Sequence, residues 1–384
     1  MENRVLIQVK DLRVGNGIAN SIMNYYKYTV SKSFSIDFLV NRNIDSKFVN
    51  IVKDYGSKIY ELPNDTRKPN FQNVKYIKDV LKKKYEIFHC NDNGFNALVA
   101  LFYAKDSVPV RIYHSHNPKE KNSLKVFLAT HLYIYPSIKM ATHYLACSQL
   151  AGSTLFKDKS FKVLNNAMDL KKFKYDGKFR VEERDKLCIN NKYVIGVVAR
   201  FEEQKNPFFV IDIFNELIKY DNNCILIWAG DGSLRKKVMD YAFKKNIIDN
   251  IIFLGVRSDV NKLYSVMDVF LLPSKFEGLG FVLVEAQISG LKCVTSECVP
   301  EEVNISEDLY RISLNQCEKT WAKKIMDIKN YKRLEKNDND RFASFDINLQ
   351  KFKLAEIYEN FIHDKKNNFT YINERMKRYK NEKK

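Results

Sequence analysis

Short apolar runs that alternate with longer helical patterns constrain the fold of this chain more than any other feature of its sequence. Such alternation is typical of βαβ units, in which parallel strands form a sheet and helices cover its faces. The sequence therefore predicts an α/β protein with two series of strands. The predicted strands are Val5–Val9, Phe34–Val40, Ile59–Leu62, Ile87–Cys90 and Val110–His114 in the first series, and Tyr193–Ala199, Cys224–Ala229, Ile251–Leu254 and Val269–Leu272 in the second.

The two series predict two Rossmann-like domains in tandem. The chain has 384 residues, and a domain typically has ~100–200 residues. We expect a first domain over residues 1–175, a second over 176–350, and a final helix and tail over 351–384, with the polar stretch Lys171–Asn191 as the linker. Ligands of open α/β sheets lie beyond the carboxyl ends of the strands. Two such domains that face each other would form a binding cleft.

Composition excludes several other classes of protein. Hydrophobic residues make up 45% and charged residues 29% of the chain, which is ordinary for a folded protein and excludes a disordered or fibrous one. Seven cysteines are scattered without a CxxC pair, so we expect reduced thiols and a cytoplasmic location. No apolar run approaches the ~20 residues of a spanning helix, and no signal sequence is evident at the amino terminus. We therefore expect a protein that is neither exported nor inserted.

The net charge of +18 is concentrated in two parts of the chain. Residues 1–180 carry 30 Lys and Arg against 15 Asp and Glu, and residues 364–384 carry 8 against 3. The remaining residues are close to neutral, so only one part of the molecule is expected to meet a polyanion. We favour an anionic membrane surface over nucleic acid, because no nucleic-acid-binding motif is present. The apolar segment 123–135 or the basic tail could make that contact, although 123–135 could equally be a buried helix, and the lysines could simply aid solubility.

The first chemical motif is Arg200 and Lys205, which follow a predicted strand. Pro207 then predicts the start of a helix. Two cations on one strand-to-helix loop suit a diphosphate, because Arg binds oxygens in a fork and Lys supplies a point charge. The alternative is a solvated loop with ordinary surface charges.

The second motif lies between Phe276 and Ala286, after the strand Val269–Leu272. Gly278 and Gly280 permit close approach of the backbone to a ligand, and the helix that follows offers free N–H groups to phosphate oxygens. Glu277 and Glu285 are eight residues apart and can point toward one site, where carboxylates suit the hydroxyl pairs of a ribose and a hexose. The alternative is a capping Glu and a surface Glu.

The histidines form weaker signals. His114 and His116 follow a strand and could bind metal, exchange protons or donate hydrogen bonds, but no third ligand is nearby, so a zinc site is not expected. No Asp-x-Asp motif follows a strand, and we predict no metal and no cofactor. His89 ends another strand and is a candidate contact for a second substrate, together with Asn117.

These motifs resemble the donor site of glycosyltransferase family 4, whose members are retaining enzymes with the two-domain GT-B fold. Tyr144–Ser148 and the turn Leu164–Asp169 also resemble family segments, with Ala167 in place of the usual glycine, and Gly15 and Gly17 resemble the family's amino-terminal glycine loop. The combination is most similar to bacterial capsular and exopolysaccharide sugar transferases. The resemblance implies that the last helix crosses back to the first domain.

The resemblance also implies roles for single residues. Arg200 and Lys205 would stabilise the leaving diphosphate in place of a metal, Glu277 would hold the transferred sugar, and Glu285 would hold the ribose. The other implied contacts are the backbone of Gly278, Leu279, Gly280 and Phe281 for the sugar or phosphate, Gly15 and Gly17 for the phosphates, Arg257 for the base, and His116 for the transferred sugar.

The expected function is therefore transfer of a hexose, with retention, from a nucleotide sugar, and the expected donor is linked to uridine diphosphate. The expected acceptor is a growing surface glycan or a polyprenyl-diphosphate-linked glycan, at the inner face of the plasma membrane. One alternative keeps the fold but makes the protein an epimerase, or a synthase with a soluble acceptor. Another is a non-enzymatic module that binds polyanions, which would leave the four charged residues of the donor motifs unexplained.

Overall fold

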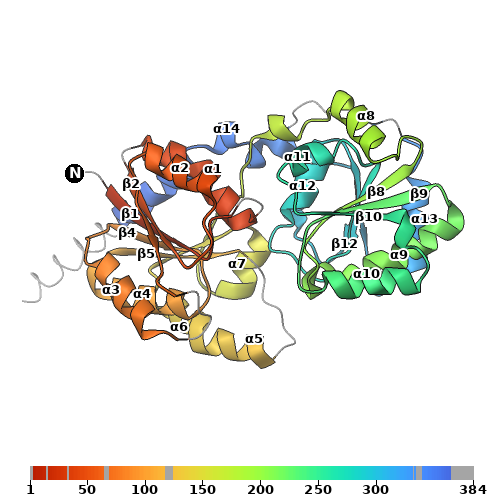
Figure 1. Cartoon of the computed structure of the whole chain (residues 1–384). Helices are drawn as coiled ribbons and strands as arrows, with labels where there is room; N and C mark the ends of the chain where they lie inside the picture. Colours follow the sequence, from red (N-terminus) through yellow and green to blue (C-terminus); the bar gives the residue numbers. More distant parts are fainter. Residues whose placement is uncertain are drawn as a thin grey trace, which may run out of the picture. The chain divides into compact units, whose positions relative to one another are not determined.

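The computed structural model describes residues 3–13, 16–32, 34–64, 69–116, 124–331, 333 and 340–364. The chain forms two compact units, which are described separately. The first unit comprises Met1–Ala167 with Gln350–Lys384, and the second comprises Met168–Leu349. Each unit contains one parallel β-sheet with helices packed on it (Figure 1).

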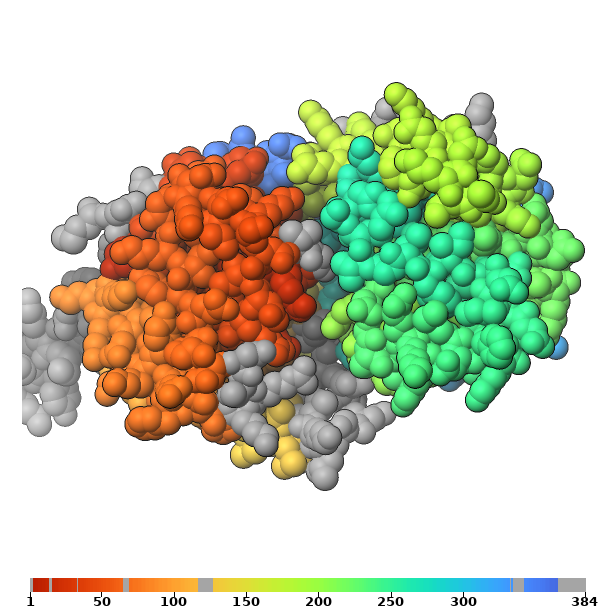
Figure 2. All heavy atoms as spheres, in the orientation of Figure 1, coloured from red at the N-terminus to blue at the C-terminus, as the bar shows by residue number. Residues whose placement is uncertain are grey.

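The sheet of the first unit has the strand order β3-β2-β1-β4-β5-β6-β7, and every neighbouring pair is parallel. Its strands are nearly continuous apolar runs because helices cover both faces of a parallel sheet. The red-to-orange amino-terminal part of the chain covers the side of this unit that Figure 2 shows. The strands are β1 (Asn3–Val9), β2 (Phe34–Val40), β3 (Ile59–Glu61), β4 (Ile87–Cys90), β5 (Val110–Ser115), β6 (His143–Ala146) and β7 (Lys162–Val163).

Some helices of the first unit begin at a polar side chain that caps them. The Asn16 side chain accepts hydrogen bonds from the first turn of α1, and Asn70 does the same for α3. A π-helical turn, η1, joins α5 to α6, so that residues 124–140 form one helical segment. The helices are α1 (Gly17–Val30), α2 (Ser46–Asp54), α3 (Phe71–Leu81), α4 (Phe95–Ser107), α5 (Leu124–Ala129), η1 (Thr130–Ile134), α6 (Tyr135–Met140) and α7 (Gln149–Phe156).

The second sheet has the order β10-β9-β8-β11-β12-β13 and is also parallel throughout. The strands are β8 (Tyr193–Val198), β9 (Cys224–Ala229), β10 (Ile251–Gly255), β11 (Val269–Leu272), β12 (Lys292–Ser296) and β13 (Leu309–Ile312). The helices are η2 (Leu170–Phe173), α8 (Gly177–Lys186), η3 (Glu203–Lys205), α9 (Pro207–Tyr220), α10 (Arg235–Lys244), η4 (Ile248–Asn250), α11 (Val260–Leu263), α12 (Phe281–Ile288), η5 (Glu301–Val303), α13 (Glu318–Asp327), η6 (Asp340–Phe345) and α14 (Ile347–Gln350). The two sheets confirm the predicted pair of Rossmann-like domains.

The predicted linker is wrong for most of its length. Within Lys171–Asn191 the chain forms the end of η2 and the whole of α8. Arg184 of α8 is buried and donates hydrogen bonds to the Val266 carbonyl oxygen and to the Asp268 carboxylate, the latter at 2.6 Å. These contacts attach α8 to the second unit, so the boundary lies between Ala167 and Met168 instead of between residues 175 and 176.

The last helical segment, residues 353–364, belongs to the first unit, as the resemblance implied. The buried Tyr358 ring packs edge-on against Phe34 of β2, with ring centroids 5.5 Å apart. The Phe361 ring lies against the His143 ring of β6, with ring centroids 4.1 Å apart. The carboxyl-terminal helix therefore completes the core of the amino-terminal unit.

Two glycines hold neighbouring loops of the second unit together. The Phe201 amide donates to the Asp231 carbonyl oxygen at 3.1 Å, and the Leu234 amide donates to that of Phe201 at 2.9 Å. A Cβ atom on Gly232 would lie 2.6 Å from the Phe201 backbone, and one on Gly230 would lie 2.1 Å from the Ala199 oxygen. Only glycine permits the loop after β9 to lie this close to the loop after β8.

We predict that Gly232→Ala destabilises the protein by about 1–3 kcal/mol, because the added methyl group collides with backbone that cannot move independently. The matched control is Gly177→Ala in the same unit, where the new Cβ would meet its nearest atom, in the Tyr175 ring, at an ordinary 3.5 Å. This control is expected to be neutral or slightly stabilising. Urea unfolding measures both, and equal midpoints for the two variants would contradict the explanation.

Candidate functional site

The centre of the second sheet is where its strand order reverses. β8 pairs with β9 on one side and with β11 on the other, so successive connections leave the middle of the sheet in opposite directions. Ligands of open α/β sheets bind at this topological switch point, beyond the carboxyl ends of the strands. The pairing therefore brings the loop after β8, with Arg200 and Lys205, beside the loop after β11, with Glu277.

Lys205 and Glu277 form the central contact of this site. The Lys205 ammonium lies 2.5 Å from Glu277 Oε1, and their side chains are only 14% and 6% exposed. The Ser274 hydroxyl donates to the same carboxylate oxygen at 2.6 Å. The Lys275 amide donates to the Gln204 carbonyl oxygen at 2.8 Å, which joins the two loops through their backbones. The structure thus confirms that these two predicted residues come together, from positions 72 residues apart.

Arg200 follows β8 and is exposed. Its carbonyl oxygen accepts from the Glu202 amide at 2.9 Å, which fixes the turn that leads to η3. Within the described part of the chain its guanidinium has no carboxylate partner. Arg200 is therefore a cation next to a neutralised Lys–Glu pair, and it can bind an anion without first breaking an ion pair.

The turn before α12 has the backbone form that the second motif predicted. Gly280 is the N-cap of the helix and has φ of +81°, a conformation that glycine adopts readily. Leu279 is buried beneath the turn, whereas Phe281 is partly exposed as the first helical residue. The first amides of α12 have no partners inside the helix and are suitable for binding anionic oxygens.

Glu285 lies in the second turn of α12, where it accepts a hydrogen bond from the Tyr264 hydroxyl at 2.5 Å. Burial raises the pKa of the Glu285 carboxyl to about 7, and the hydrogen bond from Tyr264 opposes that rise. Tyr264 itself is fully buried. Tyr264 was not among the predicted site residues, because nothing in its local sequence distinguishes it from other core tyrosines.

Arg257 does not join these residues. Its guanidinium binds the Asp259 carboxylate at 2.6 Å and the Glu183 carboxylate of α8 at 2.9 Å. These two partners raise the pKa of Arg257 despite its partial burial. Its guanidinium therefore holds α8 against the loop that follows β10, and the expectation that Arg257 contacts the base stays a prediction.

Three histidines form a cluster in the first unit. His89 of β4 lies beside His114 of β5, with Nε2 and Nδ1 3.1 Å apart, and its Nδ1 lies 2.7 Å from the Tyr358 hydroxyl. Both ring nitrogens of His89 are thus occupied and the residue is buried, so the expectation that it contacts an acceptor is wrong. The His116 ring is tilted by 35° against the His114 ring, with centroids 4.0 Å apart, and its Nε2 lies 2.8 Å from Asn91 Oδ1. Burial lowers the pKa of His116 to about 3, so its ring is neutral at pH 7.

The glycine loop is only partly described. Gly17 is the first residue of α1, and a Cβ atom there would meet nothing within 4 Å. Gly17 therefore faces open space, and its role toward phosphates stays a prediction. Gly15 and Asn117 lie outside the described residues, as does the basic tail.

Neither a metal cluster nor a membrane-spanning helix is found in the described residues. Among them, no cluster of three His, Cys, Asp or Glu side chains is arranged to hold a metal ion. None of the described helices is long and apolar enough to span a membrane.

Comparisons with known proteins show what this chain is similar to in sequence. Residues 179–341 match the family model described as glycosyl transferases group 1. The putative glycosyltransferase EpsF of Bacillus subtilis is 29% identical over 84% of this chain and 87% of its own length. The capsular polysaccharide biosynthesis glycosyltransferase CapM of Staphylococcus aureus is 27% identical over 71% of this chain and 78% of its own. A third relative is an Escherichia coli enzyme named UDP-Gal:alpha-D-GlcNAc-diphosphoundecaprenol alpha-1,3-galactosyltransferase. It is 25% identical over 77% of this chain and 83% of its own length.

A solved glycosyltransferase-like structure has the same fold. The crystal structure of Anabaena HepE in complex with UDP and glucose superposes with a TM-score of 0.77, at 16% identity, over 93% of this chain and 100% of that one. The two Rossmann-like sheets and this superposition show the GT-B fold, and the sequence is similar to group 1 glycosyltransferases, among them a bacterial enzyme of capsular polysaccharide synthesis.

Proposed function

We propose that the protein transfers a hexose, with retention, from a UDP-linked donor to a lipid-linked or growing surface polysaccharide. The observation that carries this proposal is the cluster at the carboxyl edge of β8 and β11. There the Lys205–Glu277 pair lies between loops that also supply the exposed Arg200 and the amino end of α12. The cluster combines cations and N–H groups for a diphosphate with carboxylates for sugar hydroxyls.

The diphosphate is the group that these cations suit. Among the described residues, no carboxylate binds the Arg200 guanidinium, so it is available for a phosphate. The Lys205 ammonium has three N–H groups, and one that does not bind Glu277 can donate to a phosphate oxygen. As the sugar–oxygen bond breaks, negative charge grows on the departing diphosphate, and fixed cations stabilise that charge more than they stabilise the intact donor. This role requires no metal ion, and we propose that the reaction is metal-independent.

The carboxylates are suited to hydroxyl groups. Glu285 is fixed by Tyr264 and can accept hydrogen bonds from the ribose once it is ionised. Oε1 of Glu277 is held by Lys205 and Ser274. Its second oxygen, Oε2, accepts one long hydrogen bond from Gln204 Nε2 at 3.5 Å, and we propose that it also accepts from a hydroxyl of the transferred sugar. For retention we propose front-side displacement, in which the departing phosphate accepts the proton of the attacking hydroxyl. His116, which is neutral, would contact the transferred sugar.

The relatives support the choice of donor and acceptor. The solved HepE structure contains UDP and glucose, and the name of the E. coli relative specifies a UDP-linked galactose and a diphosphoundecaprenol-linked acceptor. A UDP-sugar donor and an isoprenoid-diphosphate acceptor are therefore the first substrates to test here.

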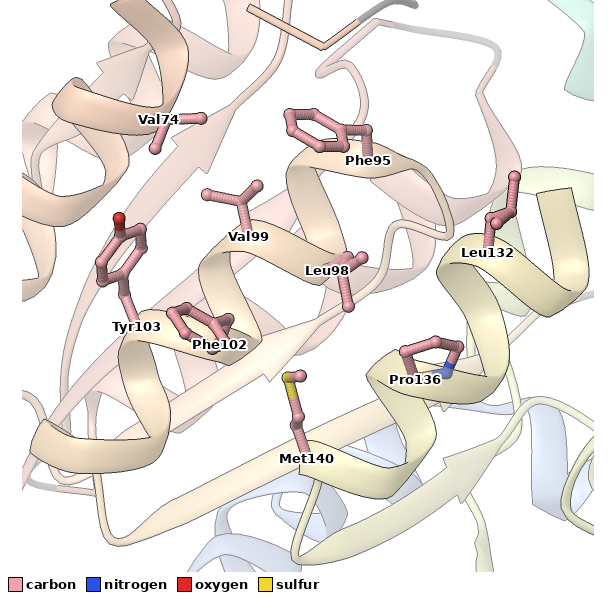
Figure 3. A pocket seen from close by; sticks show the side chains of 9 residues that line it. All are labelled: Val74, Phe95, Leu98, Val99, Phe102, Tyr103, Leu132, Pro136 and Met140. Atoms are coloured by element: carbon pink, nitrogen blue, oxygen red, sulfur yellow. The ribbon is translucent and has the colours of Figure 1, made fainter. Parts of the chain in front are cut away.

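An apolar hollow in the first unit supports a membrane-bound acceptor. The hollow has a volume of about 400 Å³ and is lined by side chains of α3, α4 and the helical segment 124–140, which point toward one another (Figure 3). Its lining residues are Val74, Phe95, Leu98, Val99, Phe102, Tyr103, Leu132, Pro136 and Met140. Phe102 is 53% and Leu132 57% exposed, and exposed apolar groups of this size are suited to contact with hydrocarbon.

Charge around the hollow favours an anionic lipid surface. No Asp or Glu occurs between Glu120 and Asp158, whereas four lysines lie in that interval. The Lys78 ammonium lies 5.4 Å from the Tyr103 ring centroid at the edge of the hollow. Each basic residue near an anionic bilayer contributes about 1 kcal/mol to binding. We propose that this face of the first unit rests on the inner surface of the plasma membrane.

The central prediction concerns turnover. Incubation with UDP-hexoses should release UDP in the presence of EDTA, and Arg200→Ala should lower the rate by about 10²–10³, the usual effect of losing one charge-stabilising group. The matched control is Lys275→Ala, which removes an exposed lysine whose ammonium binds Glu203 at 3.0 Å, its one side-chain partner among the described residues, and the rate of this variant should be unchanged. Failure of every donor, or release that depends on added metal, would contradict the proposal. A released sugar isomer without a new glycosidic bond would favour the epimerase alternative.

The raised pKa of Glu285 predicts that UDP affinity depends on pH. The carboxyl titrates near pH 7, and only its ionised form accepts two ribose hydrogen bonds, so binding should strengthen roughly tenfold from pH 6 to pH 8. Calorimetry with the wild type and Glu285→Gln measures this, because the variant retains any titration of UDP itself. Tyr264→Phe should shift the midpoint upward. Parallel pH profiles for the wild type and Glu285→Gln would refute the assignment.

Membrane contact predicts a specific effect on vesicle binding. Phe102→Asp combined with Leu132→Asp should reduce sedimentation with vesicles of anionic phospholipid at least tenfold, because two apolar side chains lose favourable burial. Phe243→Asp is the control, since Phe243 is 68% exposed on α10 of the second unit. Binding should also weaken as salt is raised. Equal binding by the double variant and the control would exclude this surface.

A further inference from the structure

The Arg333 side chain binds both backbone segments that carry the hydrogen bond between Tyr264 and Glu285. Its Nη2 donates to the Tyr264 carbonyl oxygen at 3.0 Å. Its Nε donates to the Ser289 carbonyl oxygen at 2.8 Å, and Nη2 also donates to the Ser289 hydroxyl at 2.6 Å. Arg333 lies between α13 and η6, and the proposed function gives it no role. One guanidinium therefore joins two segments that are distant in the sequence.

Ser289 connects Arg333 to Glu285 through one turn of helix. Ser289 is the C-cap of α12, and its amide donates to the Glu285 carbonyl oxygen at 3.1 Å. The last carbonyl oxygens of a helix have no partner inside it, and a cation binds them favourably. Because Ser289 lies only one turn beyond Glu285, its contact with Arg333 also restricts the backbone that carries the Glu285 carboxylate.

Tyr264 is restricted at its ring and at its backbone. The buried ring packs against Phe173 of η2 and Phe270 of β11, with ring centroids 6.4 and 5.7 Å apart. The hydroxyl reaches the Glu285 carboxylate at 2.5 Å, which requires the Tyr264 backbone to stay at a fixed distance from α12. The Arg333 guanidinium sets this distance, because it binds the Tyr264 carbonyl oxygen and the end of α12 at once.

The guanidinium of Arg333 uses all of its donors on the protein itself. Its Nη1 donates to the carbonyl oxygens of Ser265 and Met267 at 3.3 and 3.2 Å. With the contacts of Nε and Nη2, these bonds account for the five N–H groups of an arginine, which are fixed in one plane. Burial lowers the pKa of Arg333 to about 10, so the side chain is still charged at pH 7. Arg333 therefore holds backbone and has no N–H group left for a ligand.

We propose that Arg333 is a positioning residue of the donor site, which fixes the Tyr264 and Ser289 backbones relative to each other and so orients the Glu285 carboxylate. That this carboxylate binds a ribose rests on the proposed function. The orientation of Glu285 does not, because it is a property of the free protein. Arg333 acts from the amino-terminal edge of β11, whereas ligands of such sheets bind beyond the carboxyl edge.

Arg180 provides a matched control on the same turn. Among the described residues, its guanidinium binds neither Tyr264 nor Ser289. Its partners are the carbonyl oxygens of Ser265, Val266 and Met267, at 2.9, 3.1 and 3.0 Å, and the carboxylate of Asp268, at 2.5 Å. Arg180→Met should therefore destabilise the protein without disturbing the Glu285 carboxylate.

Carbon-13 spectra of glutamate-labelled protein measure the titration of Glu285, with Glu285→Gln to assign its signal. Arg333→Met should raise the pKa of this carboxyl by about 0.5–1 pH unit, because a weaker hydrogen bond from Tyr264 favours the ionised form less. Arg180→Met should leave the pKa unchanged. In a Tyr264→Phe background, Arg333→Met should add no further shift, because the hydroxyl through which it acts is gone. An unshifted Glu285 in Arg333→Met, or an equal shift in Arg180→Met, would overturn the proposal.

Arg333→Lys separates geometry from charge, and it provides a milder variant if Arg333→Met does not fold. Lysine keeps the positive charge but lacks the planar fork that reaches both segments. The pKa of Glu285 should therefore rise in Arg333→Lys as well. A wild-type titration of Glu285 in this variant would mean that charge alone acts, and the positioning role would be wrong.

Calorimetry with UDP tests the consequence for the donor. Arg333→Met should weaken UDP binding about two- to threefold at pH 7 and leave it unchanged near pH 9, where Glu285 is ionised in both proteins. Equal weakening at the two pH values would indicate a general loss of structure and would count against positioning. If the wild type binds no UDP, the proposed function fails, whereas the titration of Glu285 still decides the role of Arg333.

Discussion

The parallel pairing of β8 with β11 is the constraint on which the donor site depends. These strands are separated by more than 70 residues, yet Val269 pairs with Ile195 and Phe270 with Gly196 in the middle of the sheet. Their carboxyl ends consequently deliver a lysine and a glutamate to the same place. Gly230 and Gly232 then bring the loop after β9 against the first of these loops. The order of the strands in the sheet, more than the local sequence of either loop, therefore brings Lys205 and Glu277 together.

The resulting site combines one neutralised cation with one available cation. Lys205 is held by Glu277 at a distance that is short even for an ion pair, whereas Arg200 remains exposed. An arrangement of this kind keeps Lys205 ordered before a ligand arrives, because its position does not depend on the phosphate. The hydrogen bond from Tyr264 likewise fixes the Glu285 carboxylate before a ligand binds. Such preorganisation lowers the cost of orienting groups during the reaction.

Local patterns predicted the strands that are long and apolar and the loops that follow them. β12 and β13 were not predicted, because their runs, such as Lys292–Ser296, mix polar and apolar residues and are recognised only by their partners in the sheet. Arg257 illustrates the same limit. Its position after a strand suggested a ligand contact, but Glu183, 74 residues earlier, occupies its guanidinium. Contacts between distant segments cannot be predicted from the spacing of residues along the chain. The hydrogen bonds of Tyr264 with Glu285 and of Tyr358 with His89 are examples.

The last helix has a consequence for how the protein is made. The first unit cannot cover His89 until residue 358 has been synthesised, because Tyr358 supplies part of that core. The ribosome therefore releases a complete second unit while the first still lacks a piece of its interior. Domains commonly fold as they emerge, from the amino terminus onward, but here the amino-terminal unit must finish last. A chain truncated before residue 350 would retain every residue of the donor cluster, but its first unit would lack the helix that completes its core.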